Sequence, residues 1–159
     1  MPSRALAAPL HRHSREDEYS VVMEGRVGAL LADEVVYGEP GDLIFKPRGE
    51  WHTFWNAGKE PARLLEIISL AGFERYFEEL AEPPPRLSRD ERVETIAAIA
   101  ERYGLEMDFS SVPGLLEQYK LVFGPASAVR GGRQVQVLAD YERPRSRIES
   151  SSGASWNRS

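Results

Sequence analysis

The stretch HRHSREDEYSVVMEG, residues 11–25, holds two of the three histidines in the 159-residue chain. His11 and His13 lie one residue apart, so on an extended strand their side chains point to the same face and can bind one ion. Strict alternation would turn Glu18 away from His13. The polar segment 14–17 is suited to a loop or bulge that resets this alternation, and Glu18 is then expected to rejoin the histidines.

The third histidine, His52, follows the turn Pro47-Arg48-Gly49 at the head of another predicted strand. It shares a face of that strand with Phe54 and Asn56. Trp55 points to the opposite face, where we expect helices or a partner subunit to cover it. The chain has no cysteine, so any bound metal must be held by nitrogen and oxygen ligands.

Short strands dominate the first half of the chain. Turn residues recur between them at short intervals, which is typical of an antiparallel sandwich or barrel. The predicted strands are 19–23, 27–31, 35–37, 43–45, 51–55 and 64–70.

After Gly72 the apolar residues follow a helical period. Residues 73–80 form one amphipathic segment, which the proline run 83–85 must end. A capping box at 88–91 begins a second predicted helix, and Gly104 ends it. We therefore expect two helices that pack one apolar face each.

The rest of the chain is less regular. Residues 115–123 fit either a short helix or a strand, and residues 134–141 begin with the alternation of a strand. The polar composition beyond Glu142 is typical of a disordered tail.

Composition limits the class of protein. Hydrophobic residues make up 42% of the chain and charged residues 28%, which is ordinary for a water-soluble domain. No apolar run approaches the roughly 20 residues of a membrane span, and the N-terminus lacks the apolar segment of a signal peptide, so we expect a cytoplasmic protein. The net charge of −5 and the lack of a basic patch argue against nucleic acid as a partner.

The two histidine regions resemble the two motifs of the cupins, G-x5-HxH-x4-E-x6-G and G-x5-PxG-x2-H-x3-N. The first motif is matched by His11, His13, Glu18 and Gly25, and the second by Gly41, Pro47, Gly49, His52 and Asn56. Only Ala5 departs, because the first motif has glycine at that position. The resemblance, which extends to small bacterial single-domain cupins of quercetinase-like type, implies a mainly β, jelly-roll-like double-stranded barrel with a C-terminal α-helical appendage.

With this fold, the expected organisation has four parts. They are a barrel core over residues 1–72, a helical appendage packed on the barrel over 73–126, a possible additional strand within 127–141 and a disordered tail over 142–159.

The resemblance also implies a function. His11, His13, Glu18 and His52 would bind a divalent transition metal such as Fe, Mn, Ni, Co or Zn, between which the sequence does not choose. Open coordination positions would allow a dioxygenase-like oxidoreductase acting on a small organic substrate, with Glu18 as both ligand and proton acceptor and Phe54 in the pocket wall. The alternatives are a non-catalytic module that binds a metal or small molecule, and a cupin isomerase.

The N-terminal edge of the barrel is expected to be open. Only ten residues precede His11, whereas typical small cupins carry one or two strands there. The cover could be the strand near 134–141, a segment exchanged with a second subunit, or residues lost through the choice of start codon. We expect a homodimer, because an open edge invites strand addition and cupins commonly pair through their sheets.

Overall fold

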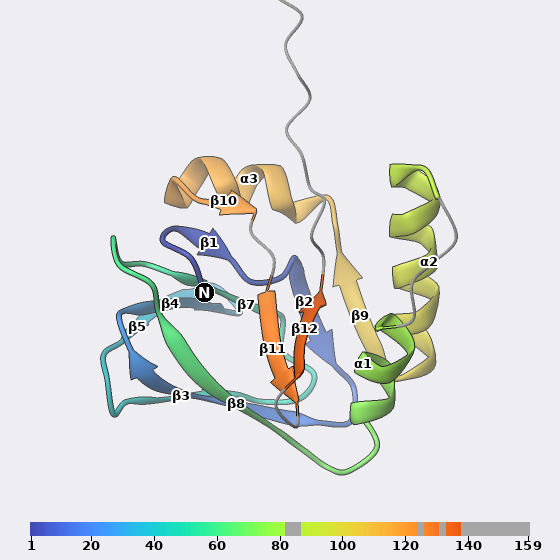
Figure 1. The fold of residues 1–159 in the computed structure, drawn as a ribbon, viewed down its shortest axis with the longest axis horizontal. Coiled ribbons are helices and arrows are strands. Elements are labelled where there is room, and N and C mark those ends of the chain that lie inside the picture. Colours follow the sequence, from blue (N-terminus) through green and yellow to red (C-terminus); the bar gives the residue numbers. More distant parts are fainter. Residues whose placement is uncertain (82–86, 124–125, 131–132, 138–159) are drawn as a thin grey trace, which may run out of the picture.

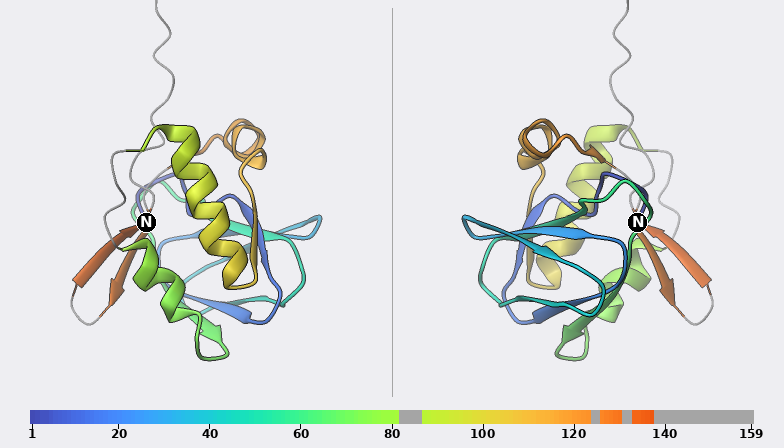
Figure 2. Two further views of the ribbon diagram at one scale, coloured as in Figure 1. Left: turned by 90° about the vertical axis from the view of Figure 1, so that its right-hand side faces the viewer. Right: turned by 90° about the vertical axis from the view of Figure 1, so that its left-hand side faces the viewer.

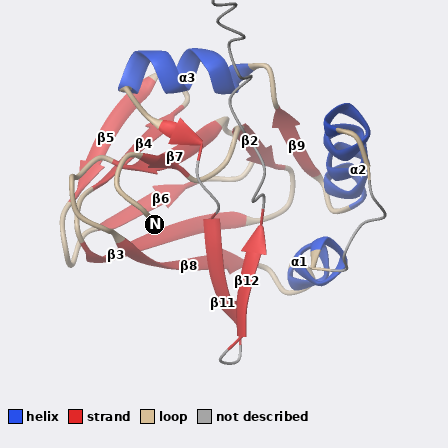
Figure 3. Ribbon diagram, turned by 45° about the horizontal axis from the view of Figure 1, so that its top comes forward, coloured by secondary structure: helices blue, strands red, loops and turns tan. Residues whose placement is uncertain are grey.

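The computed structural model describes residues 1–81, 87–123, 126–130 and 133–137 (Figure 1). It is a mainly β fold in which two sheets face each other and the helices follow the β region in the sequence. Figure 3 shows the strands gathered into one barrel-like body, with helices at its periphery. Each predicted strand between residues 19 and 70 is present, with boundaries shifted by at most a few residues.

The smaller sheet has three antiparallel strands in the order β6-β3-β8. These strands are β6 (Leu43–Lys46), β3 (Asp17–Glu24) and β8 (Arg63–Ser69). Glu18, Ser20 and Val22 of the central strand are buried, whereas the residues between them are more exposed. Alternation along the strand therefore separates an inner face from an outer face.

The larger sheet has seven strands, and its path runs β10-β1-β7-β2-β9, with β4 paired to both β7 and β5. Its strands are β1 (Ala5–Leu6), β2 (Leu10–His13), β4 (Val27–Leu31), β5 (Glu34–Gly38), β7 (His52–Asn56), β9 (Leu105–Asp108) and β10 (Val122–Phe123). His11 of β2 is paired directly with His52 of β7. The two histidine regions of the sequence are thus neighbours in one sheet.

Apolar side chains fill the space between the two sheets. Val22 and Ile44 of the smaller sheet pack with Val27 and Ala29 of the larger one. On the other side of the larger sheet, helix α3 (Ser111–Tyr119) covers Trp55. The Trp55 ring stacks on Tyr119 with centroids 4.4 Å apart, which confirms the prediction that helices cover this tryptophan.

Two further helices lie at the end of the barrel next to β9 (Figure 2). They are α1 (Glu74–Leu80) and α2 (Arg89–Arg102), which confirm both predicted helices. Ser88 and Glu91 form the predicted capping box. The residues that pack here include Phe73, Tyr76, Ala100 and Leu105.

Strand β9 lies along an edge of β2, where the sequence analysis expects the barrel to be uncovered. It pairs with β2 over four positions, from Leu10 opposite Asp108 to His13 opposite Leu105. The prediction that the strand near 134–141 could cover this edge is wrong. β12 (Arg133–Val137) pairs instead with β11 (Ala126–Arg130) in a separate two-stranded sheet, and residues 138–141 and the predicted tail lie outside the described residues.

The segment 115–123 contains both of the structures that its sequence allows. Helix α3 ends at Tyr119, Lys120 adopts a left-handed conformation, and β10 follows. β10 runs parallel to β1 and pairs Val122 with Ala5. Ala5, where the first motif has glycine, lies in strand β1. The residue with a left-handed conformation before this strand is Arg4.

Among the described residues, we find no helix with both the length and the apolar character needed to cross a bilayer.

Candidate metal centre

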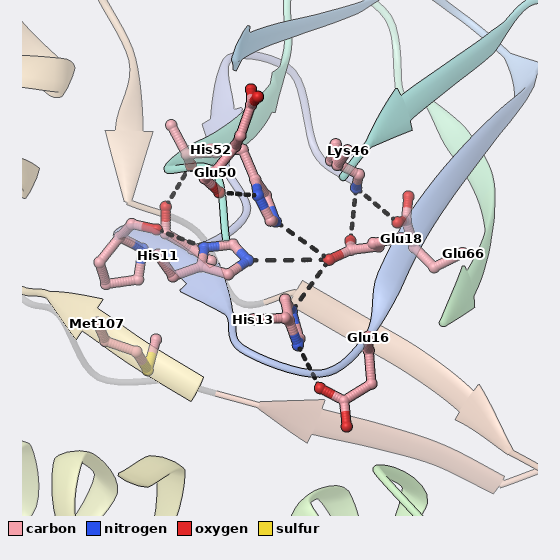
Figure 4. A network of polar contacts seen from close by, with 12 residues as sticks. His11, His13, Glu16, Glu18, Lys46, Glu50, His52, Glu66 and Met107 are labelled. Carbon is pink, nitrogen blue, oxygen red and sulfur yellow. Dashed lines mark hydrogen bonds and ion pairs between the residues drawn. The ribbon is translucent and has the colours of Figure 1, made fainter. Parts of the chain in front are cut away.

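Four side chains from three strands meet between the two sheets (Figure 4). His11 and His13 come from β2, His52 from β7 and Glu18 from β3. All four are buried, and each offers a ligand atom within 4.8 Å of the others. The structure brings together every metal-ligand candidate that the sequence analysis names.

The link between β2 and β3 explains why Glu18 faces the histidines. Residues 14–16 lie outside both strands, and the Ser14 amide donates to the Gly104 carbonyl at 2.8 Å. Gly104 has a φ of +71°, and a Cβ there would lie 2.3 Å from the Ser14 hydroxyl. This irregular link resets the alternation, as the sequence predicts, and a glycine at the end of α2 permits its close approach.

The turn of the second motif is fixed against the strands of the first. The Gly49 amide donates to the His13 carbonyl at 2.7 Å, with Gly49 in the left-handed region at a φ of +82°. The Arg48 guanidinium binds both carboxylate oxygens of Asp17 at 3.0 and 2.7 Å. These hydrogen bonds hold the pKa of Asp17 down at about 2. Arg48 thus ties the turn to the residue before Glu18.

The three histidines present their Nε2 atoms to one oxygen of Glu18. Glu18 Oε2 lies 3.2 Å from His13 Nε2, 3.3 Å from His52 Nε2 and 3.9 Å from His11 Nε2. Ligands in cis positions around an ion bound at about 2.1 Å are separated by about 3.0 Å. The donor atoms are therefore spaced for an ion after only small shifts.

Backbone carbonyls orient two of the rings. His11 Nδ1 lies 2.8 Å from the Pro9 carbonyl, and His52 Nδ1 lies 3.0 Å from the Glu50 carbonyl. Only a protonated Nδ1 can donate to a carbonyl, so these contacts assign the proton to Nδ1 and leave the Nε2 lone pair free for a metal. Burial lowers the pKa of His11 and outweighs the opposing effect of nearby Glu18. The neutral, ligating form is therefore favoured.

His13 is oriented differently. Its Nδ1 atom has no hydrogen-bond partner among the described residues, and the same holds for Glu16 Oε2. These two buried atoms are 3.6 Å apart. The Phe73 ring packs against the His13 ring with centroids 4.7 Å apart, so the residue before α1 closes this side of the site.

Lys46 is the main residue of the site that sequence reasoning missed. Its side chain is fully buried, and Nζ lies 2.5 Å from Glu18 Oε1 and 2.8 Å from Glu66 Oε2. The ammonium group also lies 4.1 Å from the centroid of the Phe54 ring. The sequence feature that could have identified Lys46 is its position on the strand. Lys46 shares the inward face of β6 with the buried Ile44.

Burial and neighbouring charges shift the pKa values of Glu18 and Glu66 in opposite directions. Burial alone would raise the pKa of Glu18, but the Lys46 ammonium, together with the three imidazoles around Oε2, holds it well below its ordinary value. Burial raises the pKa of Glu66 to about 7, against the opposing effect of Lys46 and with a contribution from nearby Glu18. Glu18 therefore carries the permanent negative charge of the site.

This arrangement is suited to a metal ion. Three neutral imidazoles and one carboxylate are a donor set for divalent first-row metals, and the geometry does not identify which one. Because Lys46 engages Oε1, only Oε2 of Glu18 is directed at the histidines. The chain thus contains a buried three-His one-Glu group suitable for a metal ion.

A mainly β barrel surrounds this group, and part of the chain matches a known domain family. Residues 1–68 match the family model described as "Cupin domain". Within the chain, residues 1–68 therefore form a cupin domain.

One curated relative is a germin-like protein, subfamily T member 2, of Arabidopsis thaliana. It is 39% identical to this chain over 62 residues, which are 36% of this chain and 28% of that protein. The matched region therefore spans little more than a quarter of the relative.

Solved structures are similar over part of the chain. A sugar phosphate isomerase of the cupin superfamily from Silicibacter pomeroyi is 26% identical, with a TM-score of 0.42 over 45% of this chain and 46% of that one. A predicted oxalate decarboxylase from Thermotoga maritima is 27% identical, with a TM-score of 0.42 over 44% of this chain and 60% of that one.

Proposed function

We propose that this protein is a metal-dependent oxidoreductase of the dioxygenase type, acting on a small organic substrate. The proposal is supported chiefly by the convergence of three buried Nε2 atoms on one oxygen of Glu18. His11, His13, His52 and Glu18 are the proposed ligands of a divalent transition metal. When bound, such a metal polarises oxygen-bearing ligands and orients them in its open coordination positions.

The protein's own residues would prepare the site for this chemistry. The carbonyls of Pro9 and Glu50 hold two imidazoles in the ligating tautomer. Lys46 directs a single oxygen of Glu18 toward the histidines. Phe54 and Phe73 place aromatic surface beside the polar centre, which excludes water and strengthens its electrostatic interactions.

In the proposed dioxygenase reaction, Glu18 also accepts a proton from the substrate. A good general base has a pKa near the working pH, whereas the pKa of Glu18 is held well below its ordinary value despite burial. Proton transfer to Glu18 would then require the salt bridge with Lys46 to weaken as the substrate binds.

The same salt bridge supports a second candidate function. A carboxylate that stays ionised and paired with Lys46 is a permanent ligand and a poor proton acceptor. These properties suit a non-catalytic cupin module that binds a metal or small molecule. A cupin isomerase is a further alternative with the same ligands.

The test combines metal content with oxygen consumption. Elemental mass spectrometry of the purified parent should find about one equivalent of a transition metal, which is lost in His52→Ala and retained in Glu106→Gln, a control for the exposed carboxylate on β9. Oxygen uptake by the loaded parent with candidate small organic substrates would support the dioxygenase. Full metal loading without turnover would favour the binding module. No metal after reconstitution would overturn the enzyme and leave a module that binds a small molecule.

A further inference from the structure

A pocket of about 280 Å³ lies on the outer side of the larger sheet, close to the lower limit of about 300 Å³ for a ligand site. Trp55 contributes to it from β7, three positions after His52 on the same strand. The two side chains therefore point to opposite faces of the sheet, and the pocket is separate from the candidate metal centre. Its lining residues are Arg4, Arg26, Tyr37, Trp55, Ala57 and Tyr119.

A glycine between two aromatic residues shapes the floor of the pocket. Gly28 of β4 pairs with Tyr37 of β5 on one side and with Trp55 of β7 on the other. The Trp55 ring lies across Gly28, where a Cβ would be only 2.5 Å from the indole carbon Cε2. Gly28 thus allows the indole to lie against the sheet between its neighbours.

Two arginines flank a small residue in the next row across the strands. Arg26 is two positions before Gly28, and its carbonyl accepts a hydrogen bond from the Ala57 amide at 2.9 Å. Arg4 is two positions before Leu6, which pairs with Trp55 from the other side of β7. The guanidinium groups therefore enter the pocket from both sides of Ala57.

Neither arginine is engaged in a buried ion pair. Arg4 is exposed and forms no ion pair with any residue that the structure describes. Arg26 lies 3.4 Å from Glu39, but these side chains are 50% and 68% exposed, and its guanidinium lies 4.5 Å above the centre of the Tyr37 ring. Exposed ion pairs are weak, so an incoming carboxylate can replace Glu39.

The edge of Trp55 adds a further hydrogen-bond donor. Tyr119 covers one side of the indole with ring centroids 4.4 Å apart, and the sheet at Gly28 covers the other. In the described part of the chain, the indole N–H has no acceptor, so it can donate to a ligand. Tyr37 is 51% exposed and offers aromatic surface beside the arginines.

We propose that this pocket binds a small aromatic carboxylate. The carboxylate lies between Arg4 and Arg26, because guanidinium groups bind carboxylates through paired N–H donors. The ring of the ligand packs beside Tyr37 and the edge of Trp55, and the volume of the pocket suits a compound with a single ring. This site does not depend on the metal or on the proposed oxidoreductase function.

An NMR titration of the full-length, ¹⁵N-labelled protein with benzoate tests the proposal. Metal is first removed with a chelator and the chelator by dialysis, so that benzoate cannot coordinate a metal ion. The indole N–H signal of Trp55, assigned with Trp55→Phe, should shift and saturate with a Kd on the order of 1 mM, which is ordinary for a ligand of this size. Trp51 is the internal reference, because its ring lies under Arg12, 4.9 Å away, and does not line the pocket.

Arginine variants show whether the pocket recognises the charge. Arg4→Gln and Arg26→Gln should each weaken benzoate binding by roughly tenfold, because each removes charged hydrogen-bond donors. Arg63→Gln is the matched control and should bind as the parent does, since Arg63 is an exposed arginine paired with Glu24 on the smaller sheet. Ala57→Leu, which fills the space between the two arginines, should abolish binding. The spectrum of each variant also shows whether it is folded.

Two further probes separate charge from ring. Acetate lacks the ring and benzamide lacks the charge, so each should bind the parent roughly tenfold or more weakly than benzoate. No shift of the Trp55 signal, or undiminished benzoate affinity in a folded Arg4→Gln, Arg26→Gln or Ala57→Leu variant, would overturn the proposal. Acetate or benzamide binding as tightly as benzoate would overturn it as well, because the pocket would then not select an aromatic carboxylate.

Discussion

The two halves of the candidate metal centre are built in different ways. The histidine half lies on β2 and β7 of the larger sheet, where the rings are oriented by backbone carbonyls at Pro9 and Glu50. The carboxylate half lies on the smaller sheet, where Glu18 is oriented by the buried ammonium of Lys46, which also contacts Glu66. Neutral ligands can be fixed by the backbone, whereas a buried carboxylate also needs a countercharge.

The largest effect is expected from removing that countercharge. Lys46→Met leaves Glu18 and Glu66 buried without a cation, so the metal-free protein should lose about 3–5 kcal/mol of unfolding free energy. Urea denaturation in the presence of a chelator measures this loss, with Lys59→Met as the exposed control. Divalent metal should restore part of the stability, because it supplies positive charge to the same carboxylate. Equal stabilities of Lys46→Met and the parent would show that Lys46 does not balance the charge of Glu18.

The histidine half should respond in metal affinity more than in stability. His52→Ala removes a proposed ligand, so affinity should fall by more than the about 10–100-fold that loss of an outer partner costs. Glu16→Gln alters only the group beside His13 Nδ1 and should stay within that smaller range. Competition with a metal-sensitive chelating dye ranks the two variants. An equal loss in both would mean that His52 is not a ligand.

The pH dependence of stability should distinguish the two carboxylates. The pKa of Glu66 is raised to about 7 by burial, so its contribution is present below the unfolded pKa and is lost as the pH rises from about 4.5 through 7. Glu18 has a lowered pKa, so its contribution is present above about 4.5 and is lost as the pH falls below that value.

The Glu66 effect can be isolated by substitution. Between about pH 5 and 8, metal-free parent should lose on the order of 2 kcal/mol relative to Glu66→Gln. Urea denaturation across this range, with a chelator present, makes the comparison. Parallel curves for the parent and Glu66→Gln would contradict the raised pKa.

The smallest effect is expected at the exposed contact between the two motifs. Arg48→Met removes the ion pair with Asp17, and little unfolding free energy should be lost because surface ion pairs are weak. The pKa of Asp17 should return toward its ordinary value, which carbon-detected NMR of the carboxylate can follow. An unchanged pKa in Arg48→Met would show that Arg48 is not its cause.

The sequence predicts the histidine half and the short strands well, for a physical reason. Alternation along a strand and the spacing of turn residues are local properties, and they place His11, His13 and His52 without knowledge of the rest of the fold. The irregular link before Glu18 is also local, because residues 14–17 are too polar to continue a buried strand.

The parts that the sequence did not predict depend on distant contacts. β9 is four residues long and its pairing with β2 joins segments about 95 positions apart, so no local pattern indicates it. Lys46 resembles an ordinary lysine before a proline turn, and only the buried Glu18 and Glu66 around it reveal its role.

The most direct test of the account is a titration of the metal-free protein with Co²⁺, followed by its visible absorption. We expect saturation at about one equivalent in the parent. The bands should be lost in both His52→Ala and Glu18→Gln, because the two halves of the site must bind the same ion. Saturation that is unchanged in Glu18→Gln, or no binding by the folded parent, would contradict a shared three-histidine, one-glutamate metal site.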